Sequence, residues 1–214
     1  MCKRIVGLLF LLVFMLGMVA CASNEVRETS VESVGEESTG AETVVTETEV
    51  SETEEVEGRD ILNDDTIPTF ELTSEDLNDG VWDSEITNTL FGSNVSPELS
   101  WEPVEGASNY VIYMVDLSAS YWIHWKSNNV TETNLPQGFE DDLHYVGPYP
   151  PSGTHEYVIY VFALAEPVER IGGLINAASY DFNGYVRDLD IGPDGAVGNV
   201  LSYGELSGIY TYGE

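Results

Sequence analysis

Apolar residues occur in short runs in the second half of the chain, and glycine and proline separate these runs. Residues 109–116 (NYVIYMVD) are rich in β-branched and aromatic side chains, and residues 121–130 (YWIHWKSNNV) alternate imperfectly. Residues 156–164 (EYVIYVFAL) are almost continuously apolar, as expected of a strand covered on both faces. The pattern predicts a mainly β fold, an antiparallel β-sandwich with few short helices. Residues 170–182 could hold a helical turn, although two adjacent glycines disfavour it.

The amino terminus has the pattern of an export signal. Lys3 and Arg4 precede an apolar stretch from Ile5 to Leu16, and small residues then lead to Cys21. The stretch is short for a membrane-spanning helix, which needs about 20 apolar residues. The ending MVAC resembles a bacterial lipoprotein signal, so we expect residues 1–21 to be removed to leave a lipid on Cys21. The protein would then be exported and anchored to the outer face of the bacterial cell membrane. An ordinary signal peptide and an uncleaved anchor are the alternatives.

Residues 22–65 differ in composition from the rest of the chain. They consist mainly of Glu, Thr, Ser and Val and contain no aromatic residue. High net charge without bulky apolar groups does not offset the entropy of ordering, so we expect a disordered acidic tether. The alternative is a binding tail. Nearly all aromatic residues beyond the signal lie in residues 66–214, which we expect to form the folded domain.

Charge and cysteine content exclude several classes of function. The chain has 38 Asp and Glu against 7 Lys and Arg, a formal net charge of −31. Nucleic acids and anionic membrane surfaces are bound through basic patches, so neither is an expected partner. Cys2 and Cys21 are the only cysteines. The exported part therefore has no disulfide and no thiolate metal site.

Four residues near the ends of the predicted strands carry candidate chemistry. Asp116 ends the first run, His124 lies between two tryptophans, and His155 and Tyr157 are two apart, so they share a face of an extended strand. Two imidazoles and a phenol can bind oxygen atoms, and a nearby carboxylate favours the charged imidazolium. Each also has a structural interpretation: a turn cap for Asp116, a hydrogen-bonded core residue for His124, and an edge ladder for the other two. The prolines of the intervening GPYPPSG segment would give a stiff wall or simply a tight connection.

Three blocks in this order resemble the phosphatidylethanolamine-binding protein family, specifically its bacterial Raf kinase inhibitor-like branch. They are SPELSW, W-x-H-W and GP-x-PP-x-G-x-H-x-Y, and the resemblance covers nearly the whole domain. It implies a β-sandwich with a small pocket at one end that accepts phosphate, acetate or a phosphoryl headgroup. Matched motif by motif, the implied ligand-binding residues are Asp116, His124, Gly147, Pro148, Pro151, His155 and Tyr157.

This chain departs from the family pattern near the implied pocket. The first block usually reads Asp-Pro-Asp-Ala-Pro, but here it is DLSAS; Glu156 stands where a basic residue is common, and Asn199 where a histidine is common. These changes would remove charges that the family uses. We therefore expect weak anion binding that strengthens as the pH falls.

The leading hypothesis is a non-enzymatic module that binds a small anionic or polar ligand without a cofactor or metal, its protein partner being unknown. A second is an enzyme in which Asp116, His124 and His155 act as acid and base or bind a metal, although no nucleophile elbow or H-E-x-x-H motif is present. A third is a protein- or glycan-interaction domain with a vestigial pocket, in which Tyr121, Trp122 and Trp125 stack on sugars. Filling the core is the alternative role of these aromatic residues.

Overall fold

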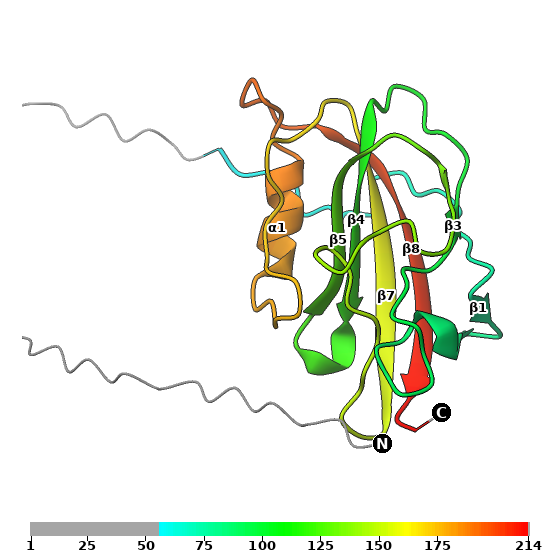
Figure 1. Cartoon of the computed structure of the whole chain (residues 1–214). Helices are drawn as coiled ribbons and strands as arrows, with labels where there is room; N and C mark the ends of the chain where they lie inside the picture. Colours follow the sequence, from blue (N-terminus) through cyan, green and yellow to red (C-terminus); the bar gives the residue numbers. More distant parts are fainter. Residues whose placement is uncertain (1–55, 214) are drawn as a thin grey trace, which may run out of the picture. The chain divides into compact units, whose positions relative to one another are not determined.

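The computed structural model describes residues 56–213, so the predicted signal peptide, Cys21 and most of the predicted tether lie outside the described residues. Within this range no helix is long and apolar enough to span a bilayer. The elements, shown in Figure 1, are β1 (Leu77–Asn78), β2 (Val81–Trp82), η1 (Ser84–Ile86), β3 (Leu99–Ser100), β4 (Asn109–Asp116), η2 (Leu117–Ala119), β5 (Trp122–Val130), β6 (Asn134–Leu135), β7 (Thr154–Leu164), α1 (Phe182–Leu189) and β8 (Val200–Thr211).

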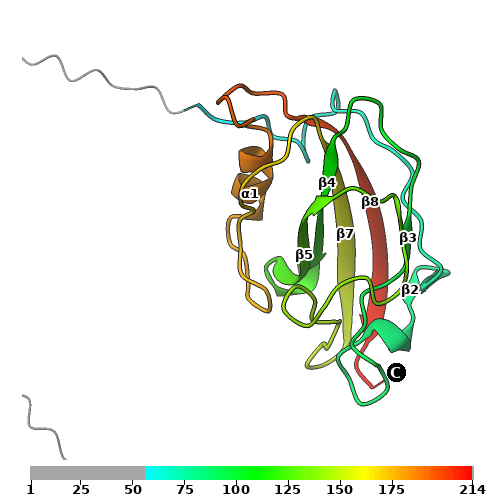
Figure 2. The same cartoon turned by 45° about the horizontal axis from the view of Figure 1, so that its top comes forward.

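The described chain is mainly β with few short helices, as predicted. Six strands form one sheet in the order β1-β2-β8-β7-β4-β5, and β3 pairs with β6 in a small second sheet. The large sheet is mixed rather than antiparallel, because β2 and β8 run parallel where Val81 pairs with Ile209. It curls strongly (Figure 2), and its partner layer is two short strands with loops rather than a second full sheet. The prediction of a mainly β fold is therefore confirmed, whereas the structure is not a regular antiparallel sandwich.

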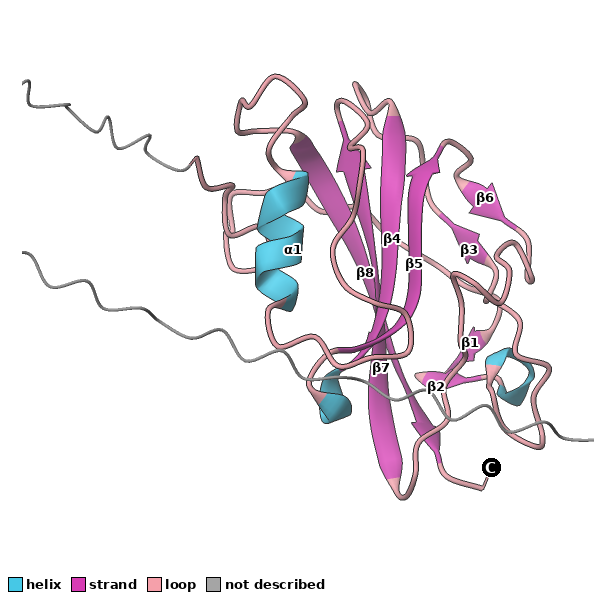
Figure 3. Cartoon of the chain, turned by 60° about the vertical axis from the view of Figure 1, so that its left-hand side comes forward, coloured by secondary structure: helices cyan, strands magenta, loops and turns pink. Residues whose placement is uncertain are grey.

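Two cores cover the two faces of this sheet. Alternate residues of β7 point to opposite faces: Tyr157, Ile159 and Val161 join one core, whereas Val158 and Phe162 join the other. The first core is covered by β3 and β6, and the second by α1 (Figure 3). Coverage on both faces explains why β7 is an almost continuous apolar run.

The helix lies just beyond the segment predicted to hold a helical turn. Helix α1 begins at Phe182, where the Asp181 side chain accepts a hydrogen bond from Gly184 N. The preceding segment instead runs along the edge of β5, where Ile123 exchanges backbone hydrogen bonds with Asn176 and Ala177. Gly173 has a φ of 78°, in the left-handed region that glycine adopts readily and that interrupts an α-helix.

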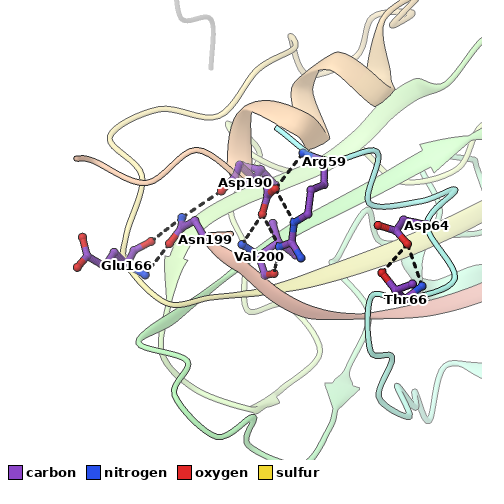
Figure 4. Close-up of polar contacts among 8 residues, drawn as sticks. Arg59, Asp64, Thr66, Glu166, Asp190, Asn199 and Val200 are labelled. Carbon is purple, nitrogen blue, oxygen red and sulfur yellow. Dashed lines mark hydrogen bonds and ion pairs between the residues drawn. The ribbon is translucent and has the colours of Figure 1, made fainter. Parts of the chain in front are cut away.

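The folded part extends into the predicted tether, which was placed at residues 22–65. Ile61 is 1% exposed and belongs to the core on the α1 side. The Arg59 guanidinium donates to both carboxylate oxygens of Asp190, at 2.9 and 2.7 Å, and to the Val200 carbonyl at 2.7 Å (Figure 4). Burial would raise the pKa of Asp190, yet Arg59 and the backbone N–H groups of Arg59 and Val200 bring it below its ordinary value. Arg59 therefore neutralises a buried carboxylate where α1 ends and β8 begins.

Candidate functional site

A cavity of about 280 Å³ lies at the end of the large sheet where β4 ends, β5 begins and β7 begins. Five of the seven predicted ligand-binding residues line it, and four other residues complete the wall. The lining consists of Asp116, Ala119, Trp122, His124, Tyr149, Pro150, Pro151, His155 and Tyr157. No lysine or arginine is among them, so the cavity has no fixed positive charge.

Asp116 has two roles at the carboxyl end of β4. One carboxylate oxygen accepts a hydrogen bond from Ser118 N at 2.8 Å and caps η2, as the structural interpretation of this residue predicts. The other accepts from His155 Nδ1 at 2.6 Å. The pairing of Asp116 with Tyr157 across β4 and β7 places this carboxylate beside both side chains. It fixes the ring of His155 through Nδ1 and leaves Nε2 for a ligand.

His124 reaches the cavity because β5 contains a bulge. Met114 pairs with Trp125 but the next residue, Val115, pairs with Ile123, so His124 is the extra residue. Such a bulge redirects a side chain that regular alternation would place elsewhere. The sequence showed only imperfect alternation at this point, and the bulge is its cause.

The protonation of His124 follows from its partners. Nδ1 lies 2.7 Å from the Val146 carbonyl and 3.2 Å from the Gly147 carbonyl, and carbonyls only accept, so Nδ1 carries the proton. Burial lowers the pKa of His124, and these carbonyls and Asp116 oppose the shift only in part. At neutral pH the imidazole is therefore uncharged, and Nε2 is a hydrogen-bond acceptor.

Tyr157 lies between the two imidazoles. Its ring is 5.2 Å from that of His124, edge to face, and 6.3 Å from that of His155, stacked. The side chain is fully buried, and its hydroxyl has no hydrogen-bond partner among the described residues. Burial, followed by the charge of Asp116, raises the pKa of this phenol. A buried hydroxyl without a partner is costly unless a ligand or water satisfies it.

Gly147 and Pro148, the other two predicted residues, lie next to the cavity lining but are not part of it. The Gly147 carbonyl accepts from His124, and a Cβ at this glycine would lie 2.1 Å from the Ile86 carbonyl oxygen. The Pro148 carbonyl accepts from Asn88 N at 3.0 Å. Both residues position the loop and do not line the cavity.

The sequence interpretation did not assign Trp122 and Tyr149 to the site. Trp122 pairs with Asp116 across β4 and β5, so it shares the face of that carboxylate. Tyr149 belongs to the GPYPPSG segment, and its ring lies 5.6 Å from that of His124. The signal that could have identified Trp122 is its pairing with Asp116. The signal for Tyr149 is its position inside the GPYPPSG motif.

Glu156 and Asn199 do not face the cavity. Glu156 lies between His155 and Tyr157 on β7, so its side chain points to the opposite face, where it accepts from Ser207 Oγ. Asn199 precedes β8 and bonds the Leu189 and Glu166 carbonyls, at the far end of the strands from His155 (Figure 4). The expectation that these two positions alter the charge of the pocket was therefore wrong.

A family model described as phosphatidylethanolamine-binding protein matches residues 57–211. The chain belongs to that family. Its fold also resembles the crystal structure of Escherichia coli YbcL, described as a new member of the mammalian PEBP family. The TM-score is 0.51 at 23% identity, over 67% of this chain and 99% of that one.

Two archaeal relatives carry the name UPF0098 protein. That of Methanothermobacter thermautotrophicus is 34% identical over 97 residues, which is 36% of this chain and 64% of the relative. That of Archaeoglobus fulgidus is 27% identical over 144 residues, which is 58% of this chain and 45% of the relative. The matched part thus spans less than two thirds of either relative.

Proposed function

We propose that the protein is an exported, membrane-tethered binding module whose cavity holds a small oxyacid group, such as phosphate, acetate or a phosphoryl headgroup, without catalysing a reaction. The observation that carries this proposal is the convergence of His124, His155 and Tyr157 on one cavity. Tyr157 has a buried hydroxyl without a partner, and both imidazoles are held through Nδ1. Export and tethering are supported by the signal pattern and the acidic segment that precedes the domain.

The donor and acceptor pattern selects the form of the ligand. His124 Nε2 accepts, so it pairs with a ligand that still carries an O–H. Tyr157 donates to a ligand oxygen, and His155 presents Nε2 to the ligand because Asp116 accepts from its Nδ1. A monoprotonated phosphate or an undissociated carboxylic acid meets this pattern, whereas a fully ionised phosphate offers only acceptors. With no lysine or arginine in the wall, binding is weak at neutral pH.

The competing functions have less support. Among the described residues, three ligand atoms of His, Asp or Glu come within 4.8 Å of one another only at Glu140, Asp141 and His144, outside this cavity. Trp125 is fully buried, so it is not available to stack on a sugar, and Trp122 is tied to the cavity wall. These observations favour binding in the cavity over metal-dependent catalysis or glycan stacking.

Calorimetry on the full chain in detergent, with phosphate and with phosphoethanolamine, tests the proposal. We expect His155→Ala and Tyr157→Phe each to weaken phosphate binding by about ten-fold, the effect of one or two hydrogen bonds. His144→Ala is the matched control, because the His144 side chain is half-exposed and bonds Asp141 away from the cavity. Absence of binding to the wild type throughout about pH 5 to pH 8 would overturn the proposal.

A further inference from the structure

We propose that Asn176 determines ligand specificity by holding the mouth of the cavity narrow, so that the site takes an unsubstituted oxyacid in preference to a phosphoester with a larger substituent. This inference deepens the proposed function and rests on it. It comes from a side chain that does not line the cavity but binds two side chains that do.

The Asn176 amide oxygen accepts hydrogen bonds from two side chains that line the cavity. Trp122 Nε1 donates to Oδ1 at 3.1 Å, and the Tyr149 hydroxyl donates to the same atom. Trp122 begins β5, and Tyr149 lies in the proline-rich loop before β7. Both are half-buried whereas His124 and Tyr157 are buried, so the first pair forms the rim and the second pair the floor.

The backbone holds Asn176 rigidly in place. Its N–H donates to the Ile123 carbonyl at 2.8 Å, and the Ile123 N–H donates to the Ala177 carbonyl at 2.9 Å, which fastens this segment to the edge of β5. Asn176 has a φ of 60°, in the left-handed region that asparagine tolerates better than most residues. The Asn176 amide is thus held at the edge of the sheet, and Trp122 and Tyr149 are held by their hydrogen bonds to it.

This arrangement limits what fits beside His124. The Tyr149 ring lies edge to face against the His124 ring, so it covers the imidazole that accepts from the ligand. Phosphate or acetate fits under the rim. In this proposal a phosphoester substituent extends between Trp122 and Tyr149, and making room for it separates the Tyr149 hydroxyl from Asn176.

The test compares inorganic phosphate with phenyl phosphate and phosphoethanolamine by calorimetry on the full chain in detergent. Asn176→Gly removes the acceptor and keeps a residue suited to positive φ. Asn176→Asp keeps an acceptor oxygen; its added charge affects the affinities for all three phosphates, so the ratio of affinities is the measured quantity. Tyr149→Phe removes only the Tyr149 hydrogen bond, leaves that of Trp122 in place, and does not change the left-handed residue. Asn129→Gly is the matched control, since Asn129 has a φ of 58° and lies outside the cavity.

We expect Asn176→Gly and Tyr149→Phe each to shift the ratio of dissociation constants about five-fold in favour of the substituted phosphates, the effect of the Tyr149–Asn176 hydrogen bond that both variants lose. The double variant should shift the ratio no further, because that bond is already absent in each single variant. Asn176→Asp and Asn129→Gly should leave the ratio unchanged. A wild type that binds phosphate while Asn176→Gly and Tyr149→Phe leave the ratio unmoved would overturn this inference and spare the proposed function. A wild type that binds none of the three would overturn both.

Discussion

At the scale of single residues, the site depends on how two similar side chains are held by different partners. His124 Nδ1 donates a hydrogen bond to backbone carbonyls, whereas His155 Nδ1 donates one to the Asp116 carboxylate. Burial also lowers the pKa of His124. The two rings therefore differ in how they are held: backbone carbonyls fix the ring of His124, and the Asp116 carboxylate fixes that of His155.

The first prediction concerns stability at acidic pH. The pKa of His124 is lowered from its ordinary 6.5, so below that pH the unfolded chain takes up a proton that the folded chain does not. The contribution of His124 to stability is therefore present in full above about pH 6.5 and decreases as the pH falls toward the folded-state pKa. His124→Asn keeps a donor for the Val146 carbonyl but does not titrate. Urea unfolding between about pH 7 and pH 5 should show a shallower loss of stability in this variant. Equal slopes in the two proteins would contradict the assignment of a neutral His124.

At the scale of elements, strand ends and one bulge create the site, and an ion pair closes the fold at its opposite end. The segment that enters the domain is fastened where α1 ends and β8 begins, through Arg59, Asp190 and Val200 (Figure 4). The Asp190 side chain is 0% exposed, and that of Arg59 is 37% exposed. Removing the guanidinium would leave a buried carboxylate with backbone N–H partners only.

The second prediction follows from that ion pair. Arg59→Ala should lower the free energy of unfolding by about 2–3 kcal/mol, somewhat less than a fully buried pair costs because Arg59 is partly exposed. Arg187→Ala is the control. Its guanidinium pairs with Glu57 and Asp60, whose side chains are 73% and 40% exposed, so its loss should cost about 0–1 kcal/mol. Denaturant unfolding of both variants gives the comparison. Equal costs would mean that Asp190 does not depend on Arg59.

The sequence predicted three of the four long strands and missed the fourth, which contains glycines. β4, β5 and β7 follow from their apolar runs, but β8 contains Gly204 and Gly208, which are typical of turns. In the structure a Cβ at Gly204 would lie 2.5 Å from the Phe70 ring, and one at Gly208 would lie 2.3 Å from Leu77. The glycines therefore make room for the segment that crosses β8, a long-range contact that no local pattern shows.

The same limit applies to the site. The motifs pointed to four residues that line the cavity, because a carboxylate, two histidines and a tyrosine at strand ends indicate chemistry. Asn176 could not be identified in this way, since it lies 54 residues from Trp122 and 27 from Tyr149 and matches no block. Its role depends on the edge segment beside β5, a tertiary contact.

At the scale of the whole molecule, the cavity proposed to hold an oxyacid lies in a strongly acidic protein. The formal net charge is −31, and no lysine or arginine lines the cavity. The field of the acidic chain therefore opposes an anion, and the proposed binding rests on local hydrogen bonds rather than on charge pairing.

The last prediction is that added salt strengthens phosphate binding instead of weakening it. Raising the ionic strength from about 0.02 to 0.2 M shortens the screening length from roughly 20 to 7 Å, which weakens the repulsion between the acidic chain and an approaching anion. We expect the affinity to rise about two- to five-fold, whereas a pocket built on lysine or arginine would lose affinity over the same range. Titrations in sodium chloride and in tetramethylammonium chloride separate this screening from specific binding of sodium to the acidic surface. A fall in affinity in both salts would mean that a local positive charge, rather than neutral donors and acceptors, holds the ligand, and the hydrogen-bond pattern assigned to His124, His155 and Tyr157 would then be wrong.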